Sequence, residues 1–132
     1  LKFSPYIPYS KIEKKIKKID ICLLPYTSKV TVSGNVGDIS QYTSPLKIFD
    51  YMITGKLIIC SNLKVIREIL KDRKNSILIN KYKEKKNWLK KIKMILKNYS
   101  KYNTIRFNAY KYAKTYNIDW RTKKLLSFNN FS

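Results

Sequence analysis

Residues 44–63 read SPLKIFDYMITGKLIICSNL and contain the signals that decide the fold. Ser44 supplies a hydroxyl that can cap a helix, and Pro45 suits the first helical position because its fixed φ is helical and it has no N–H to leave unsatisfied. Apolar side chains then cover almost every side, and Gly55 is the residue type that most often follows a helix end. A continuously apolar segment, 57–60, comes next. The stretch therefore predicts a buried helix that leads directly into a buried strand.

The alternation of helix and strand extends on both sides of this stretch. Upstream, a short basic amphipathic helix at 10–18 leads into the apolar strand 20–25, whose continuous apolar character is typical of a parallel sheet covered on both faces. Downstream, a helix at 63–70 precedes a third short strand at 77–79. This order predicts right-handed βαβ units. The expected fold class is α/β, a partial Rossmann-like parallel sheet of three to four strands flanked by helices.

A helical extension is expected at the C-terminal side, because after Asn80 the apolar periodicity is wholly helical. The apolar face of its first helix would consist of Trp88, Ile92, Ile95 and Tyr99, with Leu89 and Leu96 beside it and lysines elsewhere. Further helices are expected at 102–115 and, with Asp119 as its cap, at 120–128. We expect the last four residues to be frayed.

The length bounds the domain organisation. The chain has 132 residues and a mass of 15.7 kDa, which suffices for one core but not for two full domains. Its hydrophobic content of 44% is too high for a disordered chain. We expect a single partial domain over 1–132, with Rossmann-like βα units and a ligand site in 1–80 and helices in 81–132.

The charge is strongly basic, with 29 Lys and Arg against 8 Asp and Glu and a formal net charge of +21. Such a balance first suggests nucleic acid or an anionic membrane surface as a partner. Only 4 of these residues are Arg, the side chain best suited to bidentate phosphate and base contacts, and the lysines are scattered along the chain. The composition therefore disfavours nucleic acid and is typical of solvated, lysine-rich helix faces.

Histidine is absent, which excludes Ser-His-Asp and Cys-His catalysis and any His-bound metal. Cys22 and Cys60 lie in apolar runs without CxxC spacing, so we expect buried reduced thiols rather than a disulfide, as in a cytoplasmic protein. No apolar stretch approaches the roughly 20 residues that cross a bilayer. We expect a cytoplasmic chain, soluble or peripheral at a membrane, that needs no metal and no cofactor.

A ligand site is expected at the carboxyl edge of the sheet, where helix N-termini point free N–H groups outward. This edge comprises Tyr26, the long irregular loop that follows it, and the start of the helix at Ser44. Ser44 and Lys47 would add a hydroxyl and a cation that suit a diphosphate, and Asp50, about one and a half turns further, could accept hydrogen bonds from a sugar. Plain N-capping with ions on a helix surface is the alternative, because no P-loop, GxGxxG or metal-ligand spacing is present.

The stretch 44–63 resembles the donor-binding segment of family 4 glycosyltransferases, whose recurring form is SPLK-apolar-FEYMA-x-GKP-apolar-apolar-A-SDL. The resemblance covers about residues 3–126. Its other segments, in the family's order and approximate spacing, are 6–9, 20–26, 65–70, 75–79, 108–110 and 120–121. It implies the C-terminal, donor-binding half of a GT-B fold, in which two Rossmann-like domains face each other across a cleft. It also implies a metal-independent, retaining, hexosyltransferase-like enzyme that uses a nucleoside-diphosphate sugar.

The resemblance assigns roles to individual residues. Asp50 matches the second Glu of the family's E-x7-E motif, which typically holds the ribose hydroxyls, whereas Tyr42 stands in place of the first Glu. The segment 43–47 matches the backbone that meets the sugar and the β-phosphate, although Pro45 has no N–H. Ile7 and Pro8 match the backbone at the nucleobase. The expected donor-binding residues, with Tyr26 as part of the pocket lining, are Asp50, Ser44, Leu46, Lys47, Thr43, Tyr26, Ile7 and Pro8.

Two further expectations concern what the chain lacks. In the family, the Arg and Lys that neutralise the departing diphosphate lie upstream of the position of Leu1, and the N-terminal acceptor domain is missing, so we expect the chain alone to be inactive. Many enzymes of the family act at membranes on lipid-linked or polysaccharide acceptors, which would give a basic face a docking role.

Two alternative functions remain open at this point. The first is a basic, non-enzymatic module that binds nucleic acid or an anionic membrane surface through lysine-rich helices at 11–18 and 83–97. The second is a truncated gene product without activity.

Overall fold

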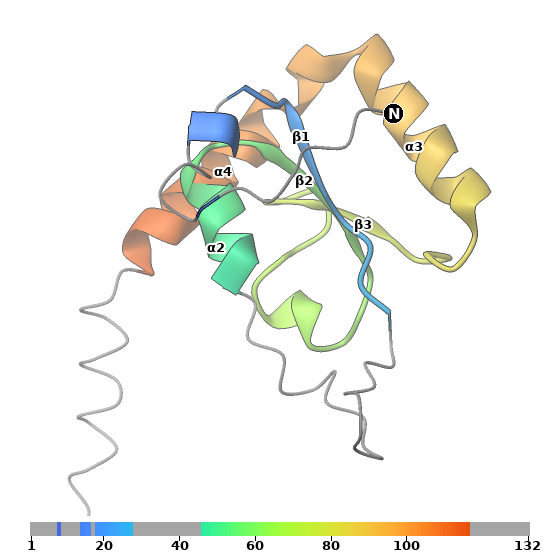
Figure 1. The fold of residues 1–132 in the computed structure, drawn as a ribbon, viewed down its shortest axis with the longest axis horizontal. Helices are drawn as coiled ribbons and strands as arrows, with labels where there is room; N and C mark the ends of the chain where they lie inside the picture. The colour runs from blue at the N-terminus through green and yellow to red at the C-terminus, as the bar shows by residue number, and fades with distance from the viewer. Residues whose placement is uncertain (1–7, 9–13, 17, 28–45, 117–132) are drawn as a thin grey trace, which may run out of the picture.

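The computed structural model describes residues 8, 14–16, 18–27 and 46–116, and the structural statements below concern this part of the chain (Figure 1). Three parallel strands are flanked by helices in a Rossmann-like α/β arrangement, which confirms the predicted fold class. The elements are β1 (Ile21–Leu24), α2 (Leu46–Ile53), β2 (Leu57–Ser61), the 3-10 helix η1 (Ile66–Glu68), β3 (Ile77–Ile79), α3 (Lys85–Lys97), the 3-10 helix η2 (Tyr99–Tyr102) and α4 (Asn103–Thr115). Of the helix predicted at 10–18, residues 14–16 are helical; the helix predicted at 120–128 lies outside the described residues.

The sheet has the order β1-β2-β3, and both pairs of strands are parallel. Cys22 of β1 lies opposite Ile58, and Leu78 of β3 lies opposite Cys60. Every residue of β2 and β3 is buried, as their continuous apolar runs predict. The expectation of two covered faces is wrong for β1, where the side chain of Leu23 is 45% exposed. This strand forms one side of the described sheet, and Leu23 belongs to neither of the two buried clusters.

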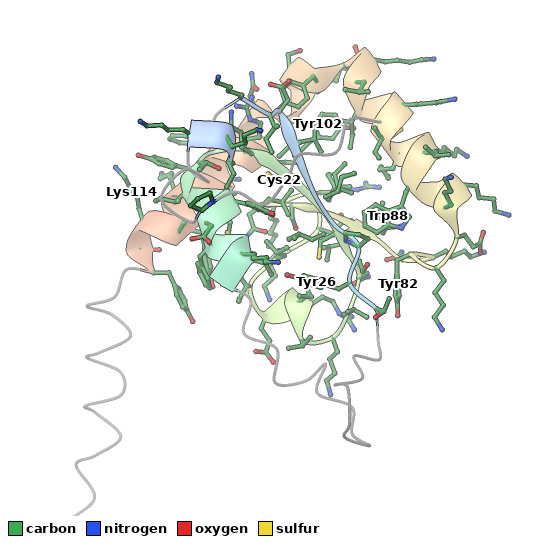
Figure 2. The ribbon with its side chains drawn as sticks, viewed as in Figure 1. Cys22, Tyr26, Tyr82, Trp88, Tyr102 and Lys114 are labelled. Atoms are coloured by element: carbon green, nitrogen blue, oxygen red, sulfur yellow. The ribbon has the colours of Figure 1, made fainter. Side chains whose placement is uncertain are left out.

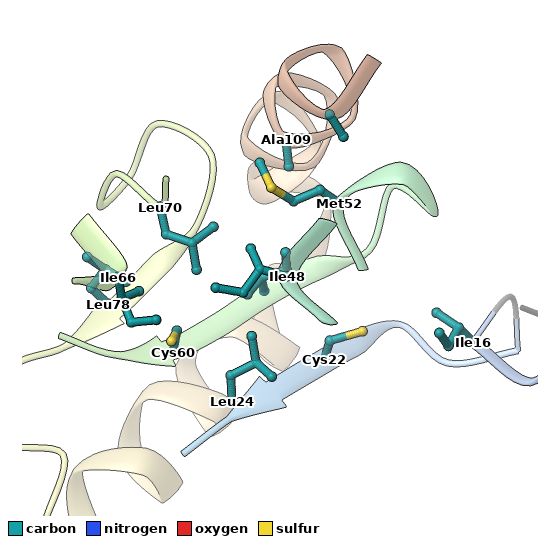
Figure 3. Close-up of a cluster of buried hydrophobic side chains, with 12 residues drawn as sticks. Ile16, Cys22, Leu24, Ile48, Met52, Cys60, Ile66, Leu70, Leu78 and Ala109 are labelled. Carbon is teal, nitrogen blue, oxygen red and sulfur yellow. The ribbon is translucent and has the colours of Figure 1, made fainter. Parts of the chain in front are cut away.

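One face of the sheet packs against α2 and α4 (Figure 3). Ile48 and Met52, one helical turn apart on α2, are fully buried, and the small side chain of Ala109 lets α4 approach Met52. The buried members of this cluster are Ile16, Cys22, Leu24, Ile48, Met52, Ile58, Cys60, Ile66, Leu70, Leu78, Ala109 and Ala113. The expectation that α2 is buried on almost every side is wrong at Ile53, which is exposed.

The opposite face of the sheet packs against α3. Ile95 is fully buried in a cluster with Leu57, Ile59, Ile77 and Ile79. Two hydrogen bonds support this layer. Trp88 Nε1 donates to the carbonyl of Tyr82 at 2.7 Å, and Tyr99 Oη donates to that of Asp20 at 2.7 Å.

The predicted core face of α3 is confirmed, but its two flanking leucines are not part of the core. Leu89 is 47% exposed and Leu96 is 60% exposed. The reason is helical geometry: at about 100° per residue, both positions lie roughly a quarter turn or more away from the direction of Ile95.

The helix predicted at 63–70 is reduced to the short 3-10 helix η1. Eight residues with β-branched Val65 and Ile66 offer little cooperative helix stability. The side chain of Asn75 caps the end of this segment, because its Oδ1 accepts from the N–H of Lys71 at 2.7 Å and its Nδ2 donates to the carbonyl of Ile69 at 3.0 Å. The helix predicted at 102–115 is confirmed as α4, with its first residue in η2.

Gly55 ends α2 as predicted, in the left-handed backbone region. Its φ is +65°, and its N–H donates to the carbonyl of Met52 at 3.0 Å. Its carbonyl accepts from Arg106 Nε of α4 at 2.9 Å, and the Arg106 guanidinium lies 5.1 Å from the ring centroid of Tyr99. The turn between α2 and β2 is thereby attached to α4.

Replacing Gly55 with alanine should lower the free energy of unfolding by about 1 kcal/mol, because a side chain disfavours positive φ. A Cβ there meets no atom within 4 Å, so the loss would be conformational rather than steric. Gly55→Asn is the matched control and should lose less, since asparagine tolerates this region. Urea denaturation measures both; equal losses would contradict the explanation.

Candidate functional site

The parallel topology brings the end of β1 and the start of α2 to one edge of the sheet. Figure 1 shows both on the same side of the molecule. Because α2 returns antiparallel to the strands, its first residue, Leu46, lies at the carboxyl edge. The sequence predicts a ligand site at this edge.

The start of α2 is electropositive. The first N–H groups of a helix lack intrahelical acceptors, and the helix dipole adds about half a positive charge there. No acidic residue occupies the first turn of α2, and Lys47 in that turn is exposed. An anion would therefore meet backbone donors and a cation together.

Asp50 lies three residues after Lys47 and is half-buried. This spacing places the two side chains on neighbouring positions of the helix surface. Partial burial makes a hydrogen bond to a carboxylate stronger than it is in bulk water. Asp50 also contributes, after burial and the proximity of Cys22, to the raised pKa of the next residue, Tyr51.

Tyr26 follows the end of β1 and is half-buried against the cluster that α2 covers (Figure 2). Burial raises the pKa of its phenol, with smaller contributions from Cys60 and Tyr51. The contribution of Tyr51 shows that Tyr26 lies within electrostatic range of α2. The phenol therefore stays protonated at neutral pH and keeps its O–H as a hydrogen-bond donor.

The predicted site residues fall into three groups. Leu46, Lys47 and Asp50 share α2, and Tyr26 lies near that helix. Pro8 is exposed. The expected contributions of Ile7, Thr43 and Ser44 lie outside the described residues.

Two cavities lie away from the start of α2, and no predicted donor residue lines either. One, of about 280 Å³, is bordered by Gly55, Asn103, Arg106, Phe107 and Tyr110, close to the opposite end of α2. The other, of about 360 Å³, lies between β3 and α3. In the described residues, no group of three His, Cys, Asp or Glu side chains could hold a metal ion.

A family model described as glycosyl transferases group 1 matches residues 1–112. The chain belongs to this family. No curated protein and no solved structure matches it. Membership of this family supports a transferase function for the domain. Glycosyl transfer requires a sugar donor and an acceptor substrate.

Both cysteines of this glycosyltransferase domain are buried free thiols, as predicted. Burial raises the pKa of Cys60 to about 12 and, against a smaller opposing effect of Lys56, that of Cys22 to about 11. Thiols that stay protonated at neutral pH are poor nucleophiles. The two cysteines therefore contribute to the core rather than to the transfer reaction.

Polar residues at the ends of β2 and β3 were not among the predicted site residues. Asn62 Nδ2 donates to Asn80 Oδ1 at 2.6 Å, which links the two strand ends. Ser61 Oγ and Asn62 Oδ1 are buried and have no hydrogen-bond partner in the described structure. The available signal was a polar residue directly after each apolar run.

No helix in the part of the chain that the structure describes combines the length and apolar character needed to cross a bilayer.

The stability of the glycosyltransferase domain should fall above about pH 9. Unfolded thiols ionise near their ordinary pKa of 9.0, whereas native Cys22 and Cys60 keep their protons until about pH 11 and 12. The unfolded state therefore binds fewer protons, and the free energy of unfolding decreases as pH rises through this window. Urea denaturation at several pH values measures the slope.

The variant carrying Cys22→Ala and Cys60→Ala removes both thiols and, with them, only their smaller effects on the pKa values of Tyr26, Tyr51 and Tyr99. Its free energy of unfolding should depend less steeply on pH between about 9 and about 11. An unchanged slope would show that thiol ionisation is not responsible.

Proposed function

We propose that this chain forms the donor-binding domain of a glycosyltransferase that transfers a sugar from a nucleoside-diphosphate sugar to an acceptor. The observation that carries the proposal is the position of α2: it begins at the carboxyl edge of the sheet, with Lys47 in its first turn and half-buried Asp50 one turn later. Family membership supplies the transferase chemistry. The proposed unit is one partial domain over 1–132.

The start of α2 would hold the diphosphate. The backbone N–H groups of Leu46 and Lys47 and the Lys47 ammonium are suited to a doubly charged group. We place Thr43 and Ser44 in the same cradle. Because the charge is met by backbone donors and a lysine, we propose that no metal ion takes part.

Asp50 would hold the nucleoside. Its carboxylate accepts hydrogen bonds only, and the vicinal hydroxyls of a ribose donate two. Tyr26 would line the same pocket with its protonated phenol, and the backbone of Ile7 and Pro8 would meet the nucleobase. A hexosyl donor, retention of configuration, the SPLK-type branch, a separate acceptor domain and inactivity of the isolated chain rest on the resemblance and stay predictions. A cytoplasmic location rests on the free cysteines and also stays a prediction.

Asp50→Ala should weaken binding of a nucleoside diphosphate by about 10-fold to 100-fold, the loss expected for charged hydrogen bonds. Asp50→Asn should lose somewhat less, because its amide oxygen still accepts. Isothermal titration calorimetry of the protein measures both. Glu68→Gln is the matched control, since Glu68 is an exposed acid on η1.

Equal affinity of wild type and Asp50→Ala would contradict the ribose assignment. Addition of EDTA should leave the affinity unchanged, and a loss of binding on chelation would contradict the metal-independent part of the proposal. A melting temperature measured for each variant separates lost binding from lost folding.

A second candidate function is docking of α3 to an anionic membrane surface. Leu89, Lys93 and Leu96 follow a spacing that places them on one helix face, and both leucines are exposed among lysines. Exposed apolar side chains beside cations are typical of helices that lie at a lipid interface. The two functions are compatible in one enzyme.

Ionic strength separates the two candidates. Binding to vesicles with anionic lipid should weaken steeply between about 50 and about 200 mM salt, whereas binding of a nucleoside diphosphate in a built site should change little. Co-sedimentation measures the first and calorimetry the second. The docking candidate would be contradicted if vesicle binding changed neither with the salt concentration nor in the double variant Leu89→Ser, Leu96→Ser.

A further inference from the structure

The cavity of about 360 Å³ between the end of β3 and α3 lies outside the proposed donor site. We name it the β3–α3 cavity. Asn87, Lys90, Lys91 and Met94 follow i, i+3, i+4, i+7 spacing, so one face of α3 forms one wall. The end of β3 and the residues that follow it form the other. Its polar and flexible lining consists of Asn80, Lys81, Asn87, Lys90, Lys91 and Met94.

The lining formed by the described residues is cationic and contains no carboxylate. Lys81, Lys90 and Lys91 contribute three ammonium groups, and none forms an ion pair with a described acidic residue. Glu84, in the turn between β3 and α3, pairs instead with Lys86 at 3.2 Å. Three clustered cations repel one another, so the cavity gains from an anion that neutralises them.

Directional donors accompany the charge. Asn80 Oδ1 already accepts from Asn62, which leaves the Asn80 amide N–H groups to donate. Asn87 Nδ2 donates to the carbonyl of Lys81 at 3.0 Å and holds the loop against α3. A phosphate oxygen would therefore meet an oriented amide as well as mobile lysines.

The neighbouring strand end holds two buried oxygens that lack partners. Ser61 is fully buried. It lies on the same face of β2 as Leu57 and Ile59, so it faces α3. It is also paired in register with Ile79, which lines the cavity. Ser61 Oγ and Asn62 Oδ1 have no hydrogen-bond partner in the described structure. Neither residue lines the cavity, so these atoms mark a polar strand end beside it and are not themselves ligand contacts.

We propose that the β3–α3 cavity binds a small phosphate ester, with the phosphate on Lys81, Lys90, Lys91 and Asn80. The volume lies in the range of about 300 to 1,000 Å³ that is usual for small-ligand sites. The proposal does not depend on the donor site, because the two share no residue. The same chemistry occurs in free glycerol phosphate and in the headgroup of phosphatidylglycerol.

Two probes test the proposal on the whole chain: glycerol 3-phosphate by calorimetry, and vesicles of phosphatidylglycerol in phosphatidylcholine by co-sedimentation. The variant Lys90→Gln, Lys91→Gln removes two charges from the cavity. The matched control Lys74→Gln, Lys101→Gln removes two charges from exposed positions that lie outside both the cavity and α3. Lys81→Gln, in the exposed turn after β3, provides a second cavity variant.

The cavity variants should weaken binding of at least one probe about tenfold, and the control by less than about twofold. Dependence on the cavity lysines for glycerol 3-phosphate identifies a free phosphate ester, and dependence for vesicles alone identifies a lipid headgroup. Absence of saturable binding of both probes would overturn the proposal. Equal losses in the cavity variant and the control would also overturn it, because they would indicate attraction by net charge alone.

Discussion

Burial of β2 on both of its faces is the constraint on which the rest of the structure depends. The strand pairs with β1 on one side and β3 on the other, so its backbone groups are satisfied within the sheet. Its side chains alternate between the layer of α2 and α4 and the layer of α3. A polar or smaller residue in this strand would disturb two layers at once. The fixed direction of β2 also sets the direction of α2, and thereby places the start of α2 at the carboxyl edge.

The two proposed sites lie on opposite faces of the sheet and suit different chemistry. The α2 face ends in a helix start with a lysine and a half-buried aspartate, which suits a diphosphate joined to a sugar. The α3 face ends in a cavity lined by lysines and amides, with buried unsatisfied oxygens near it. Both sites lie at strand ends, because backbone and polar side chains become accessible there without opening the core. Part of the positive charge of the chain therefore lies at these two strand-end sites.

Sequence patterns predicted the elements whose signals are local. Pro45, Gly55 and the apolar run after it were sufficient for α2 and β2, and the helical periodicity was sufficient for α3 and α4. The prediction at 63–70 was wrong because a short segment with β-branched Val65 and Ile66 has little helix stability of its own, and η1 keeps only Ile66–Glu68. The exposure of Leu23 depends on which strands lie at the side of the sheet, which periodicity does not encode.

The candidate site was predictable to a similar extent. The positions of Lys47 and Asp50 follow from helix spacing alone. The proximity of Tyr26 to Tyr51 of α2 depends on the folded sheet, and so does the hydrogen bond between Asn62 and Asn80. The most direct test of the central claim is the change in backbone amide chemical shifts of labelled protein on addition of a nucleoside diphosphate. The largest shifts should occur at Leu46 and Lys47, with a smaller change at Tyr26. Saturable binding that leaves these amides unmoved and shifts residues elsewhere would contradict that claim.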